Sequence, residues 1–492
     1  MAKKPNILMI FGDDIGLHNL SCYTDGLMLP KTPNIDRIAK EGMKFIQAYA
    51  EASCTAGRAA FITGQYPIRV GLSTIGMPGA DEGISELDPT LAEILKPEGY
   101  VCGQFGKNHL GDLDKFLPTV HGFDEFFGNL YHLNAEEEPF YTDYPKDMPE
   151  ALRPRGVLHA WAQPDGTQKV EDTGPLSPKR METIDDEVRE GMFNFLEKAV
   201  KNDKPFFIWH NTTAMHVWSH VDPEWHGKTQ LGYVSDRFAK HDWDIGQILD
   251  KLDELGVADN TIVIYTTDNG PETMTWPDGG ITPFRSEKGT SWEGGFRVPS
   301  MVRWPGVVKP GSIGEGIFAM EDWFPTLCAA AGVPDIVNKL LQGYKAGNKT
   351  YKVHLDGYDQ TEMLKGGESA RHEFIYWTEA DLEAVRINDY KIHFLEEMEG
   401  WVGGKTKVTW PVVVNLRTDP YEKAQTESGM YLKWYGDHIW TFVPVQQAVM
   451  KHLMSFAEFP MRNPPHTLNV DAIMKSMQNK LAGGPGRGGT KV

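Results

Sequence analysis

The amino-acid sequence predicts an α/β fold: a doubly wound, mainly parallel, mixed central sheet flanked by helices, with a smaller C-terminal antiparallel sheet subdomain. Short apolar runs alternate with amphipathic helical stretches over the first 330 of the 492 residues, an order typical of parallel sheets. Polar side chains follow almost every apolar run. From about residue 350 the helical spacing gives way to short strand-like pieces, which indicates a second sheet.

The predicted strands of the large sheet are short and apolar. Residues 6–11 form a continuous run stopped by Gly12, which is typical of a central strand buried on both faces. For the same reason further strands are expected over residues 45–50, 100–106, 205–210, 261–266 and 300–304.

The predicted helices begin after capping or proline residues and end at glycines. Thr32 and Pro33 open a helix over residues 32–39, and Gly64 ends a helix that starts at Cys54. Apolar residues at helical spacing predict four more helices, over residues 91–95, 180–200, 233–255 and 320–331.

The chain divides by composition into a catalytic part over 1–350, a smaller α+β part over 351–480 and a flexible tail over 481–492. Residues 112–180 are rich in Pro, Gly and charged residues and show little periodicity, so we expect a loop-rich insertion there, either the rim of a cleft or ordinary surface. The smaller part should hold strands at 374–377, 384–387, 390–394 and 412–416 and a helix near 443–459.

The charge balance bears on the kind of partner. The chain has 49 basic and 68 acidic residues, a net charge of −19, which argues against nucleic acid and against an anionic membrane surface. No apolar run is long enough to span a membrane, and the run at 7–11 is too short for a signal peptide. As written the sequence predicts a cytoplasmic protein, or a periplasmic or secreted one if a leader was removed.

The four cysteines are scattered and show no CxxC spacing, so neither a zinc cluster nor a disulfide framework is predicted. Pairing among Cys22, Cys102 and Cys328 stays open. Cys54 is different, because Arg58 follows it by four residues and the two share one face of the predicted helix. Free N–H groups, the helix dipole and the guanidinium predict an anion site, although a cysteine can also be simply a small buried residue.

Oxygen ligands follow two predicted strands. Asp13 and Asp14 end the first strand, and Asp268 and Asn269 follow the strand at 261–266. Adjacent carboxylates repel unless a cation neutralises them, and hard oxygen donors suit Ca²⁺ or Mg²⁺. A solvated turn is the alternative interpretation of such a pair.

Cationic and titratable groups follow the other strands. Lys107 and His109 come after the strand at 100–106, His216 comes after the strand at 205–210, and Lys288 precedes a glycine-rich stretch. Each of them alone fits a structural or solvated role. Because parallel strands bring their carboxyl ends to one edge, we expect all of these groups to meet the carboxylates.

Taken together, these passages resemble the sulfatase family within the alkaline-phosphatase superfamily. The resemblance covers about residues 5–330 and rests on specific motifs: Pro5–Leu8 with Asp13-Asp14, Thr32–Asp36, Cys54–Ala60, Thr63-Gly64, Gly106–Gly111, Thr267–Gly270, and Lys288 with Trp292–Gly295. Two positions depart from the common pattern. Ala56 stands where many members have proline, and Asn108 replaces a common tryptophan.

The resemblance implies a role for each residue. Cys54 would be converted to Cα-formylglycine by a formylglycine-generating maturation enzyme, and its hydrated aldehyde would be the nucleophile. Residue 54 would also join a site for Ca²⁺, in preference to Mg²⁺, with four ligands: Asp13, Asp14, Asp268 and Asn269. Arg58 would orient the hydrate, and Lys107 and Lys288 would bind sulfate. His109 would be the base that breaks down the intermediate, and His216 would protonate the leaving alcohol, although His210 and His220 flank it.

The function that follows is a sulfuric ester hydrolase, which cleaves the S–O bond of an anionic aryl or small-molecule sulfate monoester. One alternative is a phosphonate monoester or phosphodiester hydrolase of the same superfamily. A second alternative is an unmodified, non-catalytic homologue that only binds anions. The physiological substrate and the oligomeric state are left open by the sequence.

Overall fold

The computed structural model describes residues 3–28, 31–74, 76–273, 279, 281–397, 400 and 403–463. The predicted tail over 481–492 and the last part of the predicted 351–480 subdomain lie outside these residues. Within the described ranges, no helix combines the length and apolarity that a membrane span requires.

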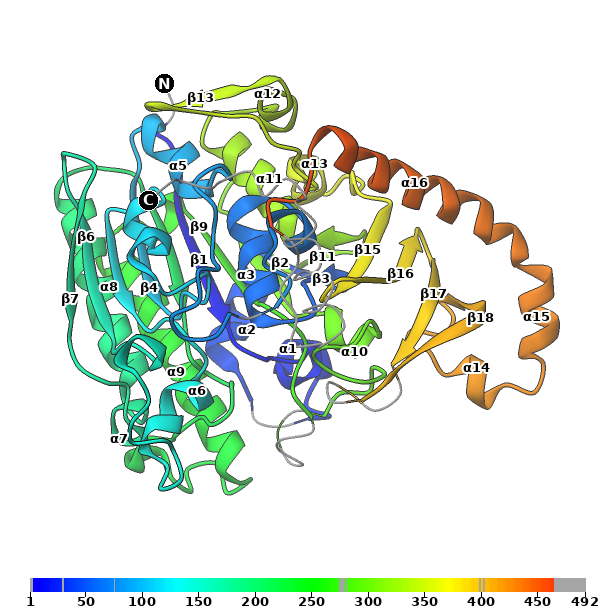
Figure 1. Cartoon of the computed structure of the whole chain (residues 1–492), viewed down its shortest axis with the longest axis horizontal. Helices are drawn as coiled ribbons and strands as arrows, with labels where there is room; N and C mark the ends of the chain where they lie inside the picture. Colours follow the sequence, from blue (N-terminus) through cyan, green and yellow to red (C-terminus); the bar gives the residue numbers. More distant parts are fainter. Residues whose placement is uncertain are drawn as a thin grey trace.

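A ten-stranded mixed sheet forms the centre of the molecule (Figure 1). Its middle five strands run parallel, and antiparallel strands extend it on both sides. In spatial order the strands are β11 (Ser312–Gly314), β2 (Met43–Phe45), β10 (Ser300–Arg303), β9 (Thr261–Thr267), β1 (Asn6–Gly12), β8 (Phe206–Asn211), β4 (Val101–Gly106), β5 (Glu125–Gly128), β6 (Leu158–Ala162) and β7 (Gln168–Asp172). The predicted fold class is confirmed.

Helices cover both faces of this sheet because the central strands are apolar on both sides. Ile7, Met9 and Phe11 of β1 pack with α3 (Cys54–Thr63), α5 (Leu91–Leu95) and α11 (Trp323–Ala330). Leu8 and Ile10, which point the other way, pack with α2 (Pro33–Glu41), α8 (Ile184–Lys201) and α9 (Tyr233–Glu254). All seven residues of β1 are buried, as predicted for a central strand.

The remaining elements are short. The single strand predicted over 45–50 is wrong: β2 ends at Phe45, and β3 (Ala48–Tyr49) pairs with β12 (Phe318–Ala319) in a separate sheet. A hairpin, β13 (Tyr344–Ala346) and β14 (Lys349–Tyr351), spans the predicted boundary at residue 350. The other helices are α1 (Ser21–Thr24), α4 (Pro67–Val70), α6 (Leu133–Glu137), α7 (Pro178–Met181), α10 (Glu293–Phe296), α12 (Ile336–Gln342), α13 (Thr361–Leu364), α14 (Ala424–Glu427) and α15 (Tyr431–Asp437).

The structure corrects the prediction that residues 112–180 form an insertion made of loops. It supplies β5, β6 and β7, which extend the central sheet. Strands β6 and β7 form a hairpin around Asp165-Gly166, where Gly166 has φ +86° and Gln163 N–H bonds Thr167 O. These outer strands are half exposed and carry polar residues, so no apolar run indicates them.

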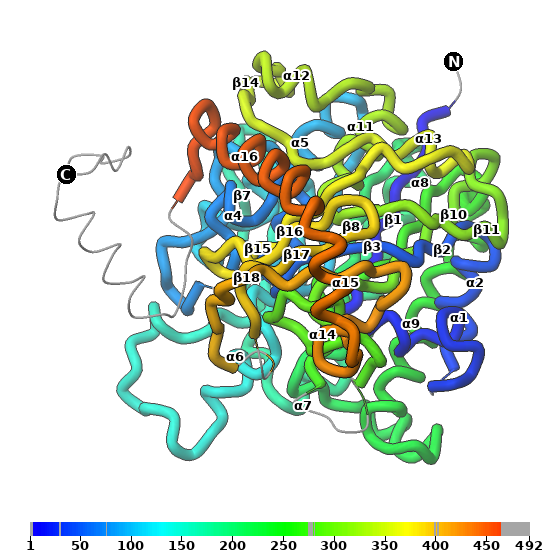
Figure 2. Tube along the Cα trace, turned by 90° about the vertical axis from the view of Figure 1, so that its right-hand side faces the viewer, coloured from blue at the N-terminus to red at the C-terminus, as the bar shows by residue number. Residues whose placement is uncertain are grey.

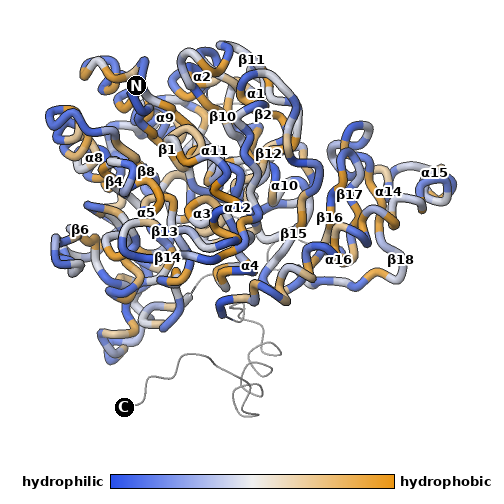
Figure 3. Tube along the Cα trace, turned by 90° about the horizontal axis from the view of Figure 1, so that it is seen from above, coloured by the Kyte–Doolittle hydropathy of each residue, from blue (hydrophilic) through white to orange (hydrophobic). Residues whose placement is uncertain are grey.

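A second sheet of four antiparallel strands stands beside the central one (Figure 3). It consists of β15 (Glu373–Thr378), β16 (Asp381–Ile387), β17 (Tyr390–Glu397) and β18 (Lys405–Asn415), and α16 (Phe442–Glu458) lies across it (Figure 2). Strand β18 starts well before the predicted 412–416. Its first half is polar and exposed, so no apolar run in the sequence indicates it. Tyr49 and Phe296 share a core with this sheet, so it is packed against the rest of the chain. The division of the chain at residue 350 stays a prediction.

Candidate active site

Four parallel strands deliver the predicted site residues to one edge of the sheet. Asp13 and Asp14 follow β1, Lys107 and His109 follow β4, His216 lies beyond β8, and Asp268 and Asn269 follow β9. All ten predicted residues, including Cys54, Arg58 and Lys288, are less than 10% exposed. Hydrogen bonds, ion pairs and ring contacts join these residues into one network.

Helix α3 places Cys54 and Arg58 against the ends of β1 and β9. A Cβ atom on Gly57 would lie only 1.9 Å from the backbone oxygen of Asp268, so glycine allows the helix to approach this closely. Arg58 Nη2 donates to Asp268 Oδ2 at 2.7 Å and to Asp13 Oδ2 at 3.3 Å, and Nη1 donates to Lys107 O at 3.0 Å. The guanidinium therefore ties three strand ends together.

Asp13 is a charged carboxylate in spite of its full burial. Its Oδ2 accepts from Lys107 Nζ at 2.6 Å. Burial acts to raise the pKa of Asp13, but Lys107 and Arg58 outweigh burial, so the pKa lies below its ordinary value. The other oxygen, Asp13 Oδ1, is buried without a hydrogen-bond partner among the described residues.

Asp14 forms a second centre of charge with Lys288. Lys288 Nζ lies 2.8 Å and 3.0 Å from the two Asp14 oxygens and 2.9 Å from Glu272 Oε1. Burial acts to lower the pKa of Lys288, but Asp14 and Glu272 raise it well above its ordinary value. Asn269 Nδ2 donates to Asp14 Oδ1 at 2.6 Å. Glu272 was not predicted, because a lone glutamate in a loop carries no signal.

The oxygen atoms around Asp13 fit a hard divalent cation. Asp13 Oδ1 and Asn269 Oδ1 are both buried without a hydrogen-bond partner in the part of the chain described. Ligand atoms of Asp13, Asp14 and His216 lie within 4.8 Å of one another. Orphaned buried oxygens are costly, and a cation would satisfy them. His216 was not predicted as a ligand. Asp268 is linked to this group by Arg58 and by a hydrogen bond that the Asp14 N–H donates to Asp268 Oδ1 at 3.4 Å.

The structure distinguishes the three neighbouring histidines that the sequence does not. His216 Nε2 lies 3.7 Å from Asp14 Oδ2. Burial and Lys288 act to lower the pKa of His216, but Asp14 acts to raise it, and the pKa lies above its ordinary value. His220 instead lies 2.8 Å from Glu137, and burial lowers the pKa of His210 to about 4. Of the three, His216 is the one that joins the network.

His109 lies in the same pocket, and its own imidazole is neutral. Its backbone has φ +58°, and its ring is buried without a hydrogen-bond partner among the described residues. Burial, Lys107 and Arg58 lower its pKa well below the ordinary value. His132 was not predicted. Its ring meets the His109 ring edge-on, with the ring centroids 5.4 Å apart, and stacks on the His216 ring, with the centroids 5.3 Å apart. It follows the end of β5, so recognising β5 would have drawn attention to it.

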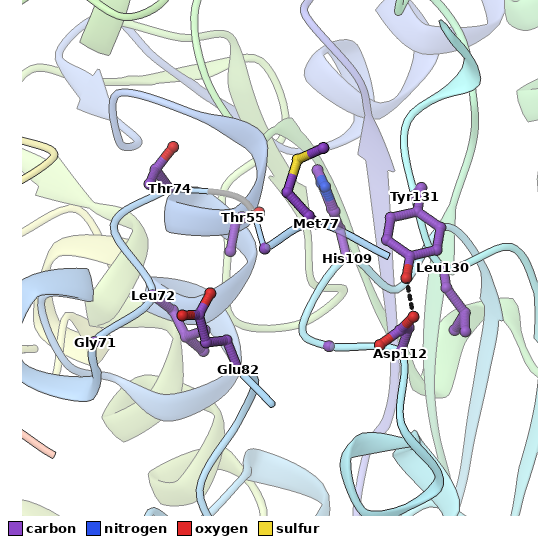
Figure 4. Close-up of a pocket in the computed structure, with 12 residues that line it drawn as sticks. Thr55, Gly71, Leu72, Thr74, Met77, Glu82, His109, Asp112, Leu130 and Tyr131 are labelled. Atoms are coloured by element: carbon purple, nitrogen blue, oxygen red, sulfur yellow. Dashed lines mark hydrogen bonds between the residues drawn. The ribbon is translucent and has the colours of Figure 1, made fainter. Parts of the chain in front are cut away.

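A pocket opens beside His109 (Figure 4). Thr55, Thr74 and Met77 line one side, and Asp112 and Tyr131 line the other, where the Tyr131 hydroxyl donates to Asp112 Oδ2. Asp112, Leu130 and Tyr131 of the 112–180 segment therefore border this pocket.

Comparison with known proteins identifies the family. A family model described as Sulfatase matches residues 5–333. The chain belongs to the sulfatase family. It is 32% identical to arylsulfatase A of Homo sapiens, over 81% of this sulfatase and 76% of that protein. It is 29% identical to N-acetylgalactosamine-6-sulfatase of Canis lupus familiaris, over 92% and 87%. The solved PsFucS1 sulfatase from Pseudoalteromonas sp. superposes with a TM-score of 0.81 at 29% identity and covers 94% of this sulfatase and 92% of its own chain.

These relatives bear on function at two levels. They agree on the reaction class, so this chain is a sulfatase-family enzyme with the fold of the alkaline-phosphatase superfamily. Their names differ in substrate, from aryl sulfates to a sulfated amino sugar. Family membership alone therefore does not identify the alcohol that carries the sulfate group in the substrate.

Proposed function

We propose that this sulfatase hydrolyses the S–O bond of a small-molecule or aryl sulfate monoester, with Cys54 matured to formylglycine and Ca²⁺ held at the ends of β1 and β9. The proposal is carried by one observation: Cys54 begins α3 inside a network of three buried cations and two histidines whose pKa values shift in opposite directions.

The charge of the site favours an anionic substrate. Three buried cations, Arg58, Lys107 and Lys288, face four buried carboxylates, Asp13, Asp14, Asp268 and Glu272, which leaves one negative charge. A divalent cation together with a protonated His216 would turn this into two positive charges, which would attract the anionic sulfate group of the ester.

The residues at the ends of β1 and β9 fit a bound cation. Asp13 Oδ1 and Asn269 Oδ1, together with Asp14 and Asp268, would hold the cation. When bound, the cation offsets charge on the sulfate oxygens, and the hydrate of formylglycine supplies the nucleophilic hydroxyl. Lys107 and Lys288 would orient the sulfate oxygens, because both ammonium groups are fixed by carboxylates beside Cys54.

The two histidines would divide the proton transfers. His216 holds a proton up to a higher pH than an ordinary histidine, so it can donate one to the leaving alcohol oxygen. His109 is neutral near pH 7 and can accept one.

The test uses protein co-expressed with a formylglycine-generating enzyme. The mass of the peptide that holds residue 54 should show conversion of the thiol to an aldehyde, and the protein should turn over 4-nitrophenyl sulfate faster than a phenyl phosphonate monoester. Faster turnover of the phosphonate would favour the alternative hydrolase. An unmodified Cys54 with no turnover of either ester would favour the anion-binding alternative.

Cys54→Ala should abolish turnover, because the variant has no side chain that can become the nucleophile. The midpoint of thermal unfolding should stay close to that of the parent, since Cys54 is small and its neighbours remain. Retained activity in this variant would refute the assignment of residue 54.

A further inference from the structure

His132 has a position that a purely structural histidine does not need. Its ring stacks on His216 with an interplanar angle of 4° and meets His109 at 87°, so it lies against both histidines of the network. We infer that His132 contacts the substrate and donates a hydrogen bond from Nε2 to an ester oxygen between His109 and His216.

The hydrogen bonding of the ring fixes which nitrogen carries the proton. The backbone N–H of Ala135 donates to His132 Nδ1 at 3.2 Å, at the start of α6. Because Nδ1 accepts this hydrogen bond it carries no proton, so the ring is neutral. A neutral ring that accepts at Nδ1 carries its hydrogen on Nε2. The tautomer is therefore set by the backbone, before any substrate arrives.

This Nε2–H group is available to a ligand. Within the described residues, no protein hydrogen bond uses it. It lies beside the network of the candidate site: His132 stacks on His216, His216 Nε2 lies 3.7 Å from Asp14 Oδ2, and Asp14 holds Lys288. A fixed donor of this kind stabilises negative charge as it develops on an oxygen, and it needs no proton transfer to do so.

Two substitutions separate this role from a structural one. In His132→Asn the amide reaches about as far as Nδ1 and can still accept from Ala135 N–H, but it lacks the outer donor. In His132→Gln the amide reaches as far as Nε2 and can donate there. We expect the Asn variant to lose about 100-fold in kcat/KM for 4-nitrophenyl sulfate, and the Gln variant to stay within about tenfold of the parent.

The same variants have readouts that do not depend on turnover. Binding of inorganic sulfate, measured by calorimetry, should weaken in the Asn variant and persist in the Gln variant. Because the donor is neutral, the pH–rate profile of the Gln variant should keep the shape of the parent profile. His159→Gln, on the distant strand β6 where His159 pairs with Glu125, is the control and should change neither quantity.

All assays are run below the unfolding midpoint of the least stable variant. His132→Ala, which lacks both nitrogens, should then lose at least as much activity as the Asn variant. The inference is overturned if the Asn variant matches the parent, if the Gln variant is the more damaged of the two, or if both lose equally while sulfate binding is unchanged. Each of these results would make His132 a helix cap and a packing group only.

Discussion

His109 and His216 share one pocket, yet their surroundings move their pKa values in opposite directions. Burial, Lys107 and Arg58 act on His109 and leave it neutral. Burial and Lys288 also oppose the charge of His216, but Asp14 favours it, and the pKa lies above its ordinary value. Groups with separated pKa values can serve as acid and base in one reaction.

His216→Gln should remove the general acid. In the parent, kcat/KM should fall as the pH rises through the raised pKa of His216, because the donating proton is lost; this decline should be absent in the variant. The loss should reach about 10²- to 10⁴-fold with an alkyl sulfate, whose leaving oxygen needs a proton, and be far smaller with 4-nitrophenyl sulfate. His220→Gln is the control. Equal losses with both esters at every pH would contradict this role.

Asp268→Asn should weaken the cation site by removing one of its negative charges. The parent should lose activity and unfold at a lower temperature after treatment with a chelator, and Ca²⁺ should restore both. At a free Ca²⁺ concentration of 100 times Kd the expected stabilisation is about 2.7 kcal/mol. The variant should need more Ca²⁺ for the same shift in unfolding temperature, whereas Asp165→Asn in an exposed turn should not. A parent indifferent to chelation would count against the site.

Most of this site could be predicted from the sequence because of the strands that carry it. Strands β1, β4, β8 and β9 are buried on both faces, so each appears as an apolar run with its functional residues at the end. The order of the strands could not be predicted, because it depends on pairings between distant runs. His132 was missed with β5, which has only four residues and begins with a glutamate. The resemblance already favoured His216 over the flanking His210 and His220, and the contact with Asp14 is the observation that supports this choice.

Gly57→Ala tests the contact between α3 and the end of β9. The added Cβ would lie 1.9 Å from Asp268 O, so the helix or the strand end must move. We expect a loss of about 1–3 kcal/mol in the free energy of unfolding and a large fall in kcat, since Cys54 and Arg58 move with the helix. Gly436→Ala is the matched control: this glycine is in α15, a Cβ atom there would have no neighbour within 4 Å, and alanine should stabilise the helix. An active, stable Gly57→Ala variant would contradict the close-contact argument.

The second sheet is joined to helix α10 by buried charges as well as by apolar packing. Lys391 Nζ on β17 lies 3.1 Å from Glu293 Oε1 and 3.0 Å from Glu422 Oε1. Glu422 Oε2 accepts from the Glu293 N–H at 2.6 Å, and the Tyr376 hydroxyl donates to Glu293 at 3.0 Å. Burial opposes the charge of Glu293, but Lys391 and Arg297 lower its pKa to about 2. Since Glu293 starts α10 only five residues after Lys288, the second sheet supports the segment that carries this lysine, for which we propose sulfate binding.

Lys391→Met should therefore affect both stability and catalysis. The substitution leaves Glu293 and Glu422 buried without their shared cation, which should cost about 3–5 kcal/mol in the free energy of unfolding. Below the unfolding temperature kcat/KM should still fall, because the segment after Lys288 loses an anchor, and denaturant unfolding combined with kinetics measures both effects. Lys433→Met breaks an exposed pair with Asp437 and should change neither. If the Lys391→Met variant is destabilised but fully active while folded, the second sheet stabilises the chain without positioning Lys288.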